Sequence, residues 1–242
     1  MKEENTRNKK YTYEDFLEIV KILRSENGCP WDRQQTHLSL RPCIMEEAAE
    51  VVAAIRKYQQ TGEYENLREE LGDVLLQVVM HSQIAKEEGL FTIEDVIQEV
   101  ASKMVHRHPH VFGDAVVDNA GQVLENWEEI KQKEKEKTLA AQFPLHEVPK
   151  ELPALTRACK VLKKADKLYQ PQDTYQQAVE KLKQAAAQLE QLSCSDYNSQ
   201  VEMQVGECLM AISNISRCCK LSQEQILSDC IEDIVEQLEP LK

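Results

Sequence analysis

The sequence EEAAE at residues 46–50 and the sequence EELGD at residues 69–73 decide the fold of this chain. Each lies within an apolar pattern that repeats with the period of an α-helix, and a polar stretch at residues 60–63 separates the two patterns. Residues three or four apart on a helix are neighbours, so the acids of each motif share a helical face. Two antiparallel helices joined near residues 60–63 would therefore let the two acidic faces meet.

Five carboxylates occupy these faces, namely Glu46, Glu47, Glu50, Glu70 and Asp73. Acidic residues on helices usually form only a solvated surface, and a Glu-x-x-Glu pattern alone is weak evidence for a site. Here apolar residues flank both motifs, and carboxylates beside such residues are costly to bury without a compensating group. A set of oxygen ligands on rigid helices suits Mg²⁺ or Mn²⁺ and fits zinc poorly. The pattern leaves two interpretations open, a divalent metal site and a solvated acidic surface.

Gly72 lies between Glu70 and Asp73, inside the second predicted helix. A glycine in a helix interior costs about 1 kcal/mol relative to alanine. Its presence therefore predicts the close approach of another backbone or of a ligand at this point.

The composition favours an all-α protein, because the 242 residues include only seven glycines and eight prolines and are rich in Glu, Lys, Gln, Ala and Leu. A net charge of −13 argues against a nucleic acid or an anionic membrane as the main partner. A small phosphorylated substrate is compatible with this charge where a metal and local basic residues neutralise it. The polar N-terminus and the lack of a long apolar run predict a cytoplasmic protein. Its eight cysteines have no Cys-x-x-Cys spacing and are expected to be reduced thiols.

Helix boundaries follow from the apolar periods and from two capping-box patterns, Thr12 with Asp15 and Thr92 with Asp95. The first box predicts a helix that ends near residues 27–28, and the second opens a helix with an apolar face. Further helices are predicted over residues 42–58, 67–88 and 122–135. The intervening segment at residues 29–42 has no clean period and is predicted to be a loop. Within that loop, Trp31 and Asp32 could line a pocket, or Trp31 could fill the core.

Basic residues cluster near the end of the helix that follows Thr92. Lys103 and Arg107 are one turn apart, where the helix dipole favours cations; alternatively, they bind phosphate oxygens.

Three histidines follow at alternating positions within residues 106–112 and suggest zinc. No fourth ligand is close, however, and Pro109 breaks the helix, so zinc is disfavoured.

Five motifs occur in a fixed order along the chain: GCPWD, EEAAE, LREELGD, KMVHRHPHVF and NWEEIK. As an ordered set over residues 12–137, they resemble the MazG family of nucleoside triphosphate pyrophosphohydrolases. The resemblance implies an all-α, Mg²⁺-dependent and usually dimeric enzyme that cleaves nucleoside triphosphates to the monophosphate and pyrophosphate. It also implies a house-cleaning role or control of the nucleotide pool.

Carried over position by position, the resemblance implies that Glu47, Glu50, Glu70 and Asp73 are the metal ligands. Glu46 lies beside them, and we expect it to orient or deprotonate the attacking water. The resemblance also implies that Lys103 and Arg107 contact the phosphates. It implies that Trp127 and Lys131, on the following predicted helix, hold the rest of the nucleotide. With the two candidates from the predicted loop, the expected substrate contacts are Lys103, Arg107, Trp127, Lys131, Trp31 and Asp32.

The second half of the chain repeats the first in degenerate form. Residues 205–217 align with residues 71–83, so that Gly206 matches Gly72, and residues 222–231 track residues 92–101. Two amphipathic helices can resemble each other by chance, but the matched glycine and cap favour a duplication. The chemistry is lost in this copy: Gln184, Ala185, Gln188, Gln204 and Glu207 stand at the acidic positions, and Asp233 and Gln237 at the basic ones.

We therefore expect two tandem MazG-like helical bundles, the first catalytic and the second degenerate. The predicted parts are a disordered leader at 1–10, the catalytic domain at 11–137, a proline-containing linker at 138–152 and the degenerate domain at 153–242, which supports dimerisation or folding.

Two other functions are compatible with parts of the pattern. One is a regulatory protein that binds nucleotides without turnover. The other is a di-iron helical bundle, which is disfavoured because it normally shows Glu-x-x-His pairs. Here the residues three after Glu47 and Glu70 are Glu50 and Asp73.

Overall fold

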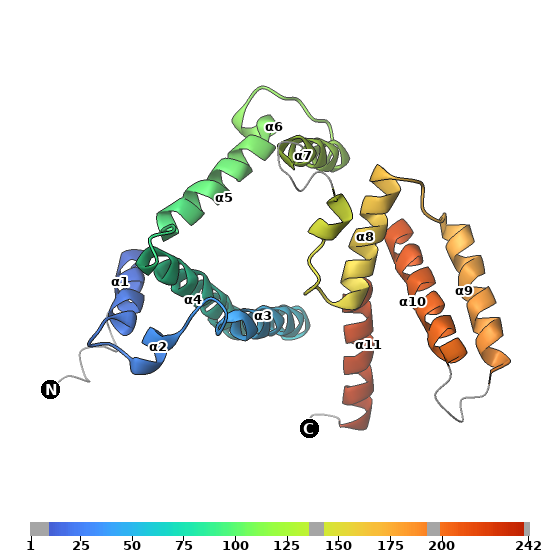
Figure 1. The fold of residues 1–242 in the computed structure, drawn as a ribbon, viewed down its shortest axis with the longest axis horizontal. Helices are drawn as coiled ribbons and strands as arrows, with labels where there is room; N and C mark the ends of the chain where they lie inside the picture. The colour runs from blue at the N-terminus through green and yellow to red at the C-terminus, as the bar shows by residue number, and fades with distance from the viewer. Residues whose placement is uncertain (1–9, 136–142, 193–198, 240–242) are drawn as a thin grey trace. The chain divides into compact units, whose positions relative to one another are not determined.

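The chain is helical in every part that the structure describes. The computed structural model describes residues 10–135, 143–192 and 199–239, in which helices are joined by turns and no strand occurs. The chain divides into two compact units, residues 1–127 and 128–242, and both are drawn in Figure 1. The all-α class expected from composition is confirmed. The predicted disordered leader lies outside the described residues except for Lys10, as do residues 138–142 of the predicted linker.

The first unit consists of a long antiparallel helix pair with shorter helices around it. Its elements are α1 (Tyr13–Arg24), α2 (Pro30–Gln34), α3 (Arg41–Thr61), α4 (Glu65–Glu87), α5 (Ile93–Arg107), α6 (Pro109–Phe112) and the first part of α7 (Ala120–Lys135). Both capping boxes predicted from the sequence form, at Thr12 before α1 and at Thr92 before α5. Gly62 ends α3 with a left-handed φ of 77°, which glycine adopts without strain.

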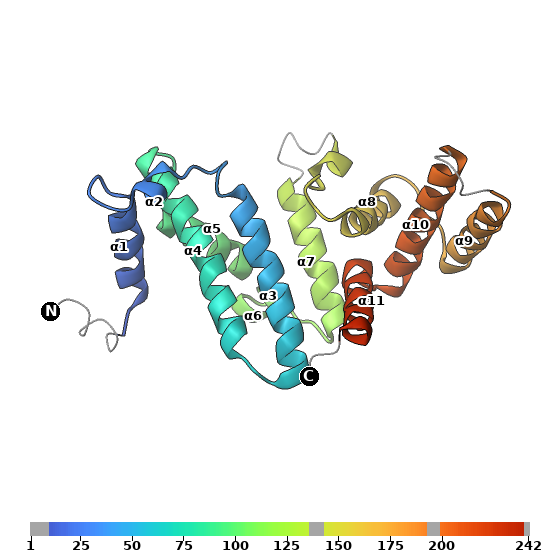
Figure 2. The same cartoon turned by 90° about the horizontal axis from the view of Figure 1, so that it is seen from below.

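α3 and α4 pack along each other, as the two apolar periods predicted, and Figure 2 shows the pair side by side. The main core cluster lies where Val20 of α1 and Leu40 meet Val79, Met80 and Ile84 of α4. The buried residues of α4 all fall between Gln77 and Ala85. The N-terminal half of α4, which carries the EELGD motif, therefore lies beyond this core.

Two predictions about residues 25–42 are wrong. The segment predicted as a loop contains α2, a helix too short to show a period, which begins with proline at its first position. Trp31 on this helix is 61% exposed, so it does not fill the core. In addition, α1 ends at Arg24 rather than near residues 27–28, because the Ser25 N–H bonds the Ile22 carbonyl in a tight turn.

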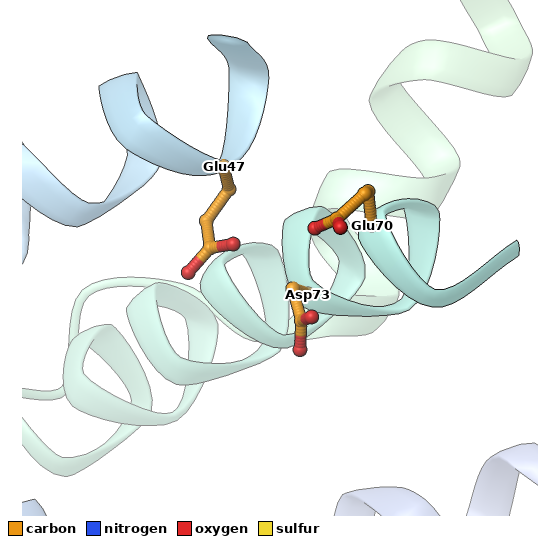
Figure 3. A group of neighbouring side chains, drawn as sticks. All are labelled: Glu47, Glu70 and Asp73. Carbon is orange, nitrogen blue, oxygen red and sulfur yellow. The ribbon is translucent and has the colours of Figure 1, made fainter. Parts of the chain in front are cut away.

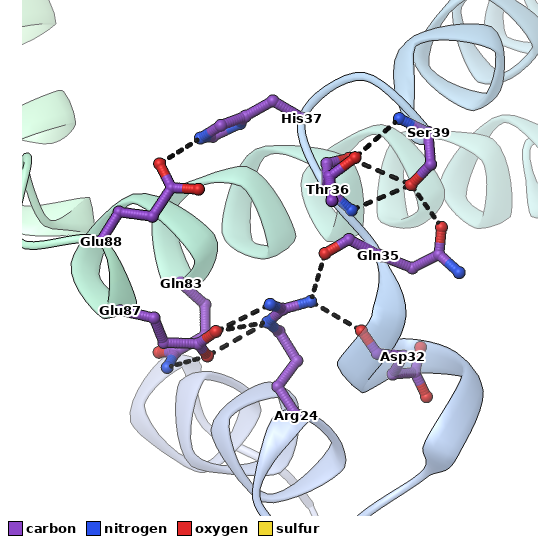
Figure 4. Close-up of polar contacts among 9 residues, drawn as sticks. All are labelled: Arg24, Asp32, Gln35, Thr36, His37, Ser39, Gln83, Glu87 and Glu88. Carbon is purple, nitrogen blue, oxygen red and sulfur yellow. Dashed lines mark hydrogen bonds and ion pairs between the residues drawn. The ribbon is translucent and has the colours of Figure 1, made fainter.

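Arg24 holds α2 against α1 and α4, as Figure 4 shows. Its guanidinium is buried, bonds the Glu87 carboxylate at 2.7 Å, and donates to the carbonyl oxygens of Asp32 at 2.6 Å and Gln35 at 3.2 Å. Burial alone would raise the pKa of Glu87, but the hydrogen bonds from Arg24 and Gln83 outweigh burial and lower this pKa.

We expect Arg24→Met to lower the free energy of unfolding by about 2–3 kcal/mol, since it leaves a carboxylate and two carbonyl groups without their charged donor. Urea unfolding followed by circular dichroism measures this loss. Lys21→Met is the control, because Lys21 only pairs with Glu18 on the surface and should contribute about 0.5 kcal/mol or less. Equal effects of the two substitutions would show that the Arg24 contacts do not stabilise the fold.

The second unit is a smaller set of helices that follows the latter part of α7. Its elements are η2 (Pro144–Glu147), α8 (Ala154–Leu168), α9 (Tyr175–Glu190), α10 (Ser199–Cys219) and α11 (Gln223–Leu238). α10 packs against both α8 and α9. The pair of α10 and α11 repeats the order of α4 and α5, with Gly206 inside α10 as Gly72 is inside α4. Ser222 precedes α11 as Thr92 precedes α5, but its side chain makes no capping bond.

The seven cysteines among the described residues are all free, as their spacing predicted. Within residues 10–135, 143–192 and 199–239, no helix is both long enough and apolar enough to cross a membrane.

Candidate active site

Three of the predicted carboxylates come together between α3 and α4. Glu47 of α3 and Glu70 and Asp73 of α4 each offer one oxygen atom, and these atoms lie within 4.8 Å of one another. Figure 3 shows the Glu47 side chain reaching from α3 towards the two acids on α4. All three residues are half-buried. The antiparallel pairing predicted from the sequence therefore places these acids in one group.

Helical spacing explains how the group forms. Glu70 and Asp73 are one turn apart and share a face of α4. On α3, Ala54 lies two turns after Glu47 on the same face and is fully buried, so its small side chain lets the two helices approach.

The surroundings of Glu47 raise the pKa of its carboxyl. Burial raises the pKa of this carboxyl, and the negative charges of Asp73 and Glu50 raise it further. A hydrogen bond from Gln77 acts in the opposite direction. A divalent cation would reverse this balance, because it would replace repulsion between the carboxylates by attraction to a shared charge.

Two carboxamides on α4 that were not among the predicted site residues contact this group. Asn66 Nδ2 donates to Glu70 Oε1 at 2.6 Å, and Gln77 Nε2 donates to Glu47 Oε1 at 3.5 Å. Asn66 lies four residues before Glu70, and Gln77 lies four residues after Asp73, so one face of α4 carries an amide, two acids and an amide. That spacing was visible in the sequence, but the contact with Glu47 required the helix pairing.

Glu46 and Glu50 lie outside the group of three. Glu50 is exposed but close enough to Glu47 to form a side-chain hydrogen bond with it and to raise its pKa. Glu46 is exposed at the start of the same motif. The roles of Glu50 as a ligand and of Glu46 beside the water stay predictions.

The predicted phosphate-binding cations lie near the C-terminal end of α5. Lys103 pairs with Glu99 at 2.7 Å, and the Arg107 guanidinium lies 5.3 Å from the centre of the Trp127 ring. Figure 1 shows α5 leaving α4 at an angle, so that its C-terminal end beside α6 does not lie along the α3–α4 pair. The side chains of Arg107, at the end of α5, and Trp127, on α7, are thereby brought together.

The remaining predicted site residues lie on α7 and α2, and His108 contacts one of the residues already described. Lys131 is exposed one turn after Trp127 on α7. Trp31 is exposed on α2, and the backbone carbonyl of Asp32 accepts a bond from Arg24. His108 stacks edge-on against Trp127 with ring centres 4.8 Å apart.

The histidines of residues 106–112 do not assemble a metal site in the part of the chain that the structure describes. His108 Nδ1 lies 2.6 Å from the Met104 carbonyl oxygen. The rings of His108 and His110 are tilted with centres 5.6 Å apart. The metal-competent group among the described residues is the acidic one on α3 and α4.

Comparison with known proteins identifies the family. The MazG nucleotide pyrophosphohydrolase domain matches residues 35–112, which include α3, α4 and α5. The chain is 36% identical over 230 residues to the nucleoside triphosphate pyrophosphohydrolase/pyrophosphatase MazG of Thermotoga maritima, covering 95% of this chain and 85% of that protein. The chain belongs to the MazG family.

Other relatives match over part of their length. YabN of Bacillus subtilis, an uncharacterised protein, is 44% identical over 219 residues, covering 90% of this chain and 44% of YabN. The nucleoside triphosphate pyrophosphohydrolase of Escherichia coli K12 is 43% identical over 150 residues, covering 62% of this chain and 55% of that protein. The chain thus spans about half the length of these two relatives.

In the second unit of this MazG-family chain, only one of the three positions that align with the acidic group carries an acid. At the position of Glu47, α9 carries the buried Ala185, and at the position of Glu70, α10 carries the buried Gln204. Glu207, at the position of Asp73, is exposed. Within the described residues, the group of three acids occurs in the first unit.

Proposed function

We propose that this chain hydrolyses nucleoside triphosphates to the monophosphate and pyrophosphate with the help of Mg²⁺, for which Mn²⁺ can substitute. One observation carries the proposal: Glu47, Glu70 and Asp73 converge within 4.8 Å on two packed helices. The names of the Thermotoga and Escherichia relatives support the reaction class. Membership of the MazG family supports the same chemistry.

The residues present fit a hard divalent cation. All donors in the group are carboxylate oxygens, which Mg²⁺ and Mn²⁺ prefer. When bound, the metal would neutralise part of the triphosphate charge and lower the pKa of the attacking water. In this proposal Glu50 completes the ligand set from its place beside Glu47, and Glu46 accepts the proton of the water.

The substrate contacts in this proposal are the cations and aromatic residues at the end of α5 and on α7. Arg107 and Lys103 bind phosphate oxygens, because guanidinium offers a bidentate fork and ammonium a point charge. Trp127 and Lys131 hold the rest of the nucleotide, and the flat Trp127 ring can stack on a base. Trp31 and Asp32 contribute to substrate specificity in the same proposal.

We propose that the active form is a homodimer. The helices that carry the carboxylates and the cations expose apolar side chains, namely Val52, Ile55, Leu71, Leu75, Ile97, Val100 and Met104. Exposed apolar residues of this density on neighbouring elements are typical of a face that another subunit covers. Association through this face would also allow cations of one chain to approach the carboxylates of the other.

Val100→Glu is expected to produce a monomer and to lower activity at least about tenfold, since one buried charge at an interface costs several kcal/mol. Light scattering coupled to size exclusion measures the mass of the particle. Val116→Glu is the matched control, because Val116 is 88% exposed in the segment between α6 and α7. An active monomer after Val100→Glu would contradict the dimer.

The degenerate second copy has a structural role in this proposal. The residues at the positions of Leu71, Leu75 and Ala101 are Val205, Leu209 and Ile231, and all three are exposed. Exposed apolar residues without the group of three acids fit folding support or dimerisation. Ile231→Glu tests this role. The mass of the particle is measured by light scattering coupled to size exclusion, as for Val100→Glu.

The expected setting is the cytoplasm, with nucleotides as the substrates and with neither nucleic acids nor membranes as partners. The net charge of −13 argues against nucleic acids and anionic membranes as the main partners. A panel of canonical and modified triphosphates with Mg²⁺ tests the reaction and its place in nucleotide-pool control. Equimolar monophosphate and pyrophosphate are expected. Release of inorganic phosphate alone, or tight binding without products, would contradict the proposed reaction.

A further inference from the structure

Gln77 is a buried amide at the junction of the acidic group and the core. It lies on α4 and is 6% exposed, and its Nε2 contacts Glu47 Oε1 of α3 at 3.5 Å. Its own Oε1 is buried and accepts no hydrogen bond from the described residues. Gln77 therefore joins the two helices at the point where Glu47 enters the acidic group.

Burial of this amide is costly to the fold. A buried carbonyl oxygen without a donor loses its bonds to water and gains none in return. An apolar side chain would fill the same space between α3 and α4 without this loss. The free energy of folding therefore does not explain the presence of an amide at position 77.

The internal repeat provides a comparison within the same chain. Gln77 aligns with Ala211 of α10, and Glu47 aligns with Ala185 of α9. Both alanines are 4% exposed, so the packed helix pair is kept in the second unit. The copy without the acid also lacks the amide, which links the amide to the acid rather than to helix packing.

We propose that Gln77 is a positioning residue for the metal site, whose N–H group holds the Glu47 carboxylate towards Glu70 and Asp73. This inference rests on the function proposed above. A neutral donor suits the task, because a lysine at this position would also donate but would bring a positive charge that competes with the cation. The amide directs one lone pair of Glu47 and leaves its charge available for the metal.

Mn²⁺ binding to the full chain without nucleotide, followed by electron paramagnetic resonance, tests this proposal. Gln77→Met has a similar volume and no donor, and it is expected to weaken Mn²⁺ binding about tenfold. The melting temperature in EDTA should stay the same or rise, because the orphan oxygen is removed. Gln77→Ala copies the residue of the repeat and serves as a second variant should methionine impair folding.

Gln83→Met is the matched control. Gln83 also lies on α4 and donates to a glutamate four residues on, Glu87, at 2.9 Å, but it is outside the acidic group. Its substitution should leave Mn²⁺ affinity unchanged. In a Glu47→Gln background, Gln77→Met should cause no further loss.

The outcomes separate this proposal from the one on which it rests. Mn²⁺ affinity within twofold of wild type in both Gln77 variants would overturn the role of Gln77 and leave the metal site standing. A wild-type chain that binds no Mn²⁺ would overturn both. A lower melting temperature in EDTA with unchanged Mn²⁺ affinity would assign Gln77 to packing alone.

Discussion

Glu47→Gln and Asp73→Asn are each expected to reduce Mg²⁺-dependent pyrophosphate release by about a thousandfold. Each substitution removes one negative ligand from the group of three acids, and the metal contributes several kcal/mol to the reaction, with about 1.4 kcal/mol for each factor of ten. A coupled assay for pyrophosphate at saturating Mg²⁺ measures the loss. Glu69→Gln is the control, since Glu69 is an exposed acid of the same motif outside the group.

Although Glu47→Gln is expected to lose activity, it should increase the stability of the metal-free protein. Folding raises the pKa of Glu47 through burial and through the charges of Asp73 and Glu50. The folded state then binds more protons than the unfolded state between the ordinary and the raised pKa, so stability falls as pH rises through that window. Above it the charged Glu47 destabilises the fold, and glutamine removes this cost.

The melting temperature in EDTA at neutral pH should therefore rise in Glu47→Gln while activity is lost. Near-normal turnover of both variants would refute the site. A lower melting temperature together with lost activity would mean that the substitution damaged the fold, and would contradict the electrostatic account of Glu47.

Arg107→Met should lower kcat/KM by about 10- to 100-fold, which corresponds to the loss of one charge-assisted hydrogen bond. The loss should appear mainly in KM if Arg107 binds phosphate equally in the ground and transition states. Arg107→Lys should recover only part of the loss, because lysine lacks the bidentate fork and the flat face that lies 5.3 Å from the Trp127 ring centre.

Steady-state kinetics with a nucleoside triphosphate measures both variants of Arg107. Lys57→Met makes the same change of charge on α3, where Lys57 pairs with Glu63 at 3.0 Å. Identical KM values for the Lys57 and Arg107 methionine variants would show that Arg107 does not contact the substrate.

Local features of the fold were predictable because local sequence determines them. The boxes at Thr12 and Thr92 formed because a hydroxyl and a carboxylate three residues apart satisfy two helix-end N–H groups. The pairing of α3 with α4 followed from two apolar periods and a polar turn. With the pairing fixed, the meeting of Glu47 with Glu70 and Asp73 followed from helical spacing.

Features that depend on distant contacts were not predictable. α2 is only five residues long and is held by Arg24, whose contacts across the chain leave no local pattern. The expectation that another backbone approaches Gly72 is wrong for the described residues: apart from the adjacent residues and the backbone of α4 itself, none of their atoms lies within 4 Å of the place that a Cβ would occupy. The angle of α5 to α4 depends on packing between helices, so it was not visible in the sequence.

Gln77 illustrates the limit of pattern reading at the site itself. In the sequence it is one polar residue within an apolar run, Leu75 to Met80. Its contact with Glu47 depends on which turns of α3 and α4 pack against each other. Only the structure and the repeat together connect this amide with the acid.

Diffraction from crystals grown with Mn²⁺ and a non-hydrolysable nucleoside triphosphate would locate the metal by its anomalous signal. We expect a peak with carboxylate oxygens of Glu47, Glu70 and Asp73 at about 2.0–2.6 Å, and with phosphate oxygens on its open side. No peak between α3 and α4, or a peak held by other residues, would contradict the proposal that these three acids bind the catalytic cation.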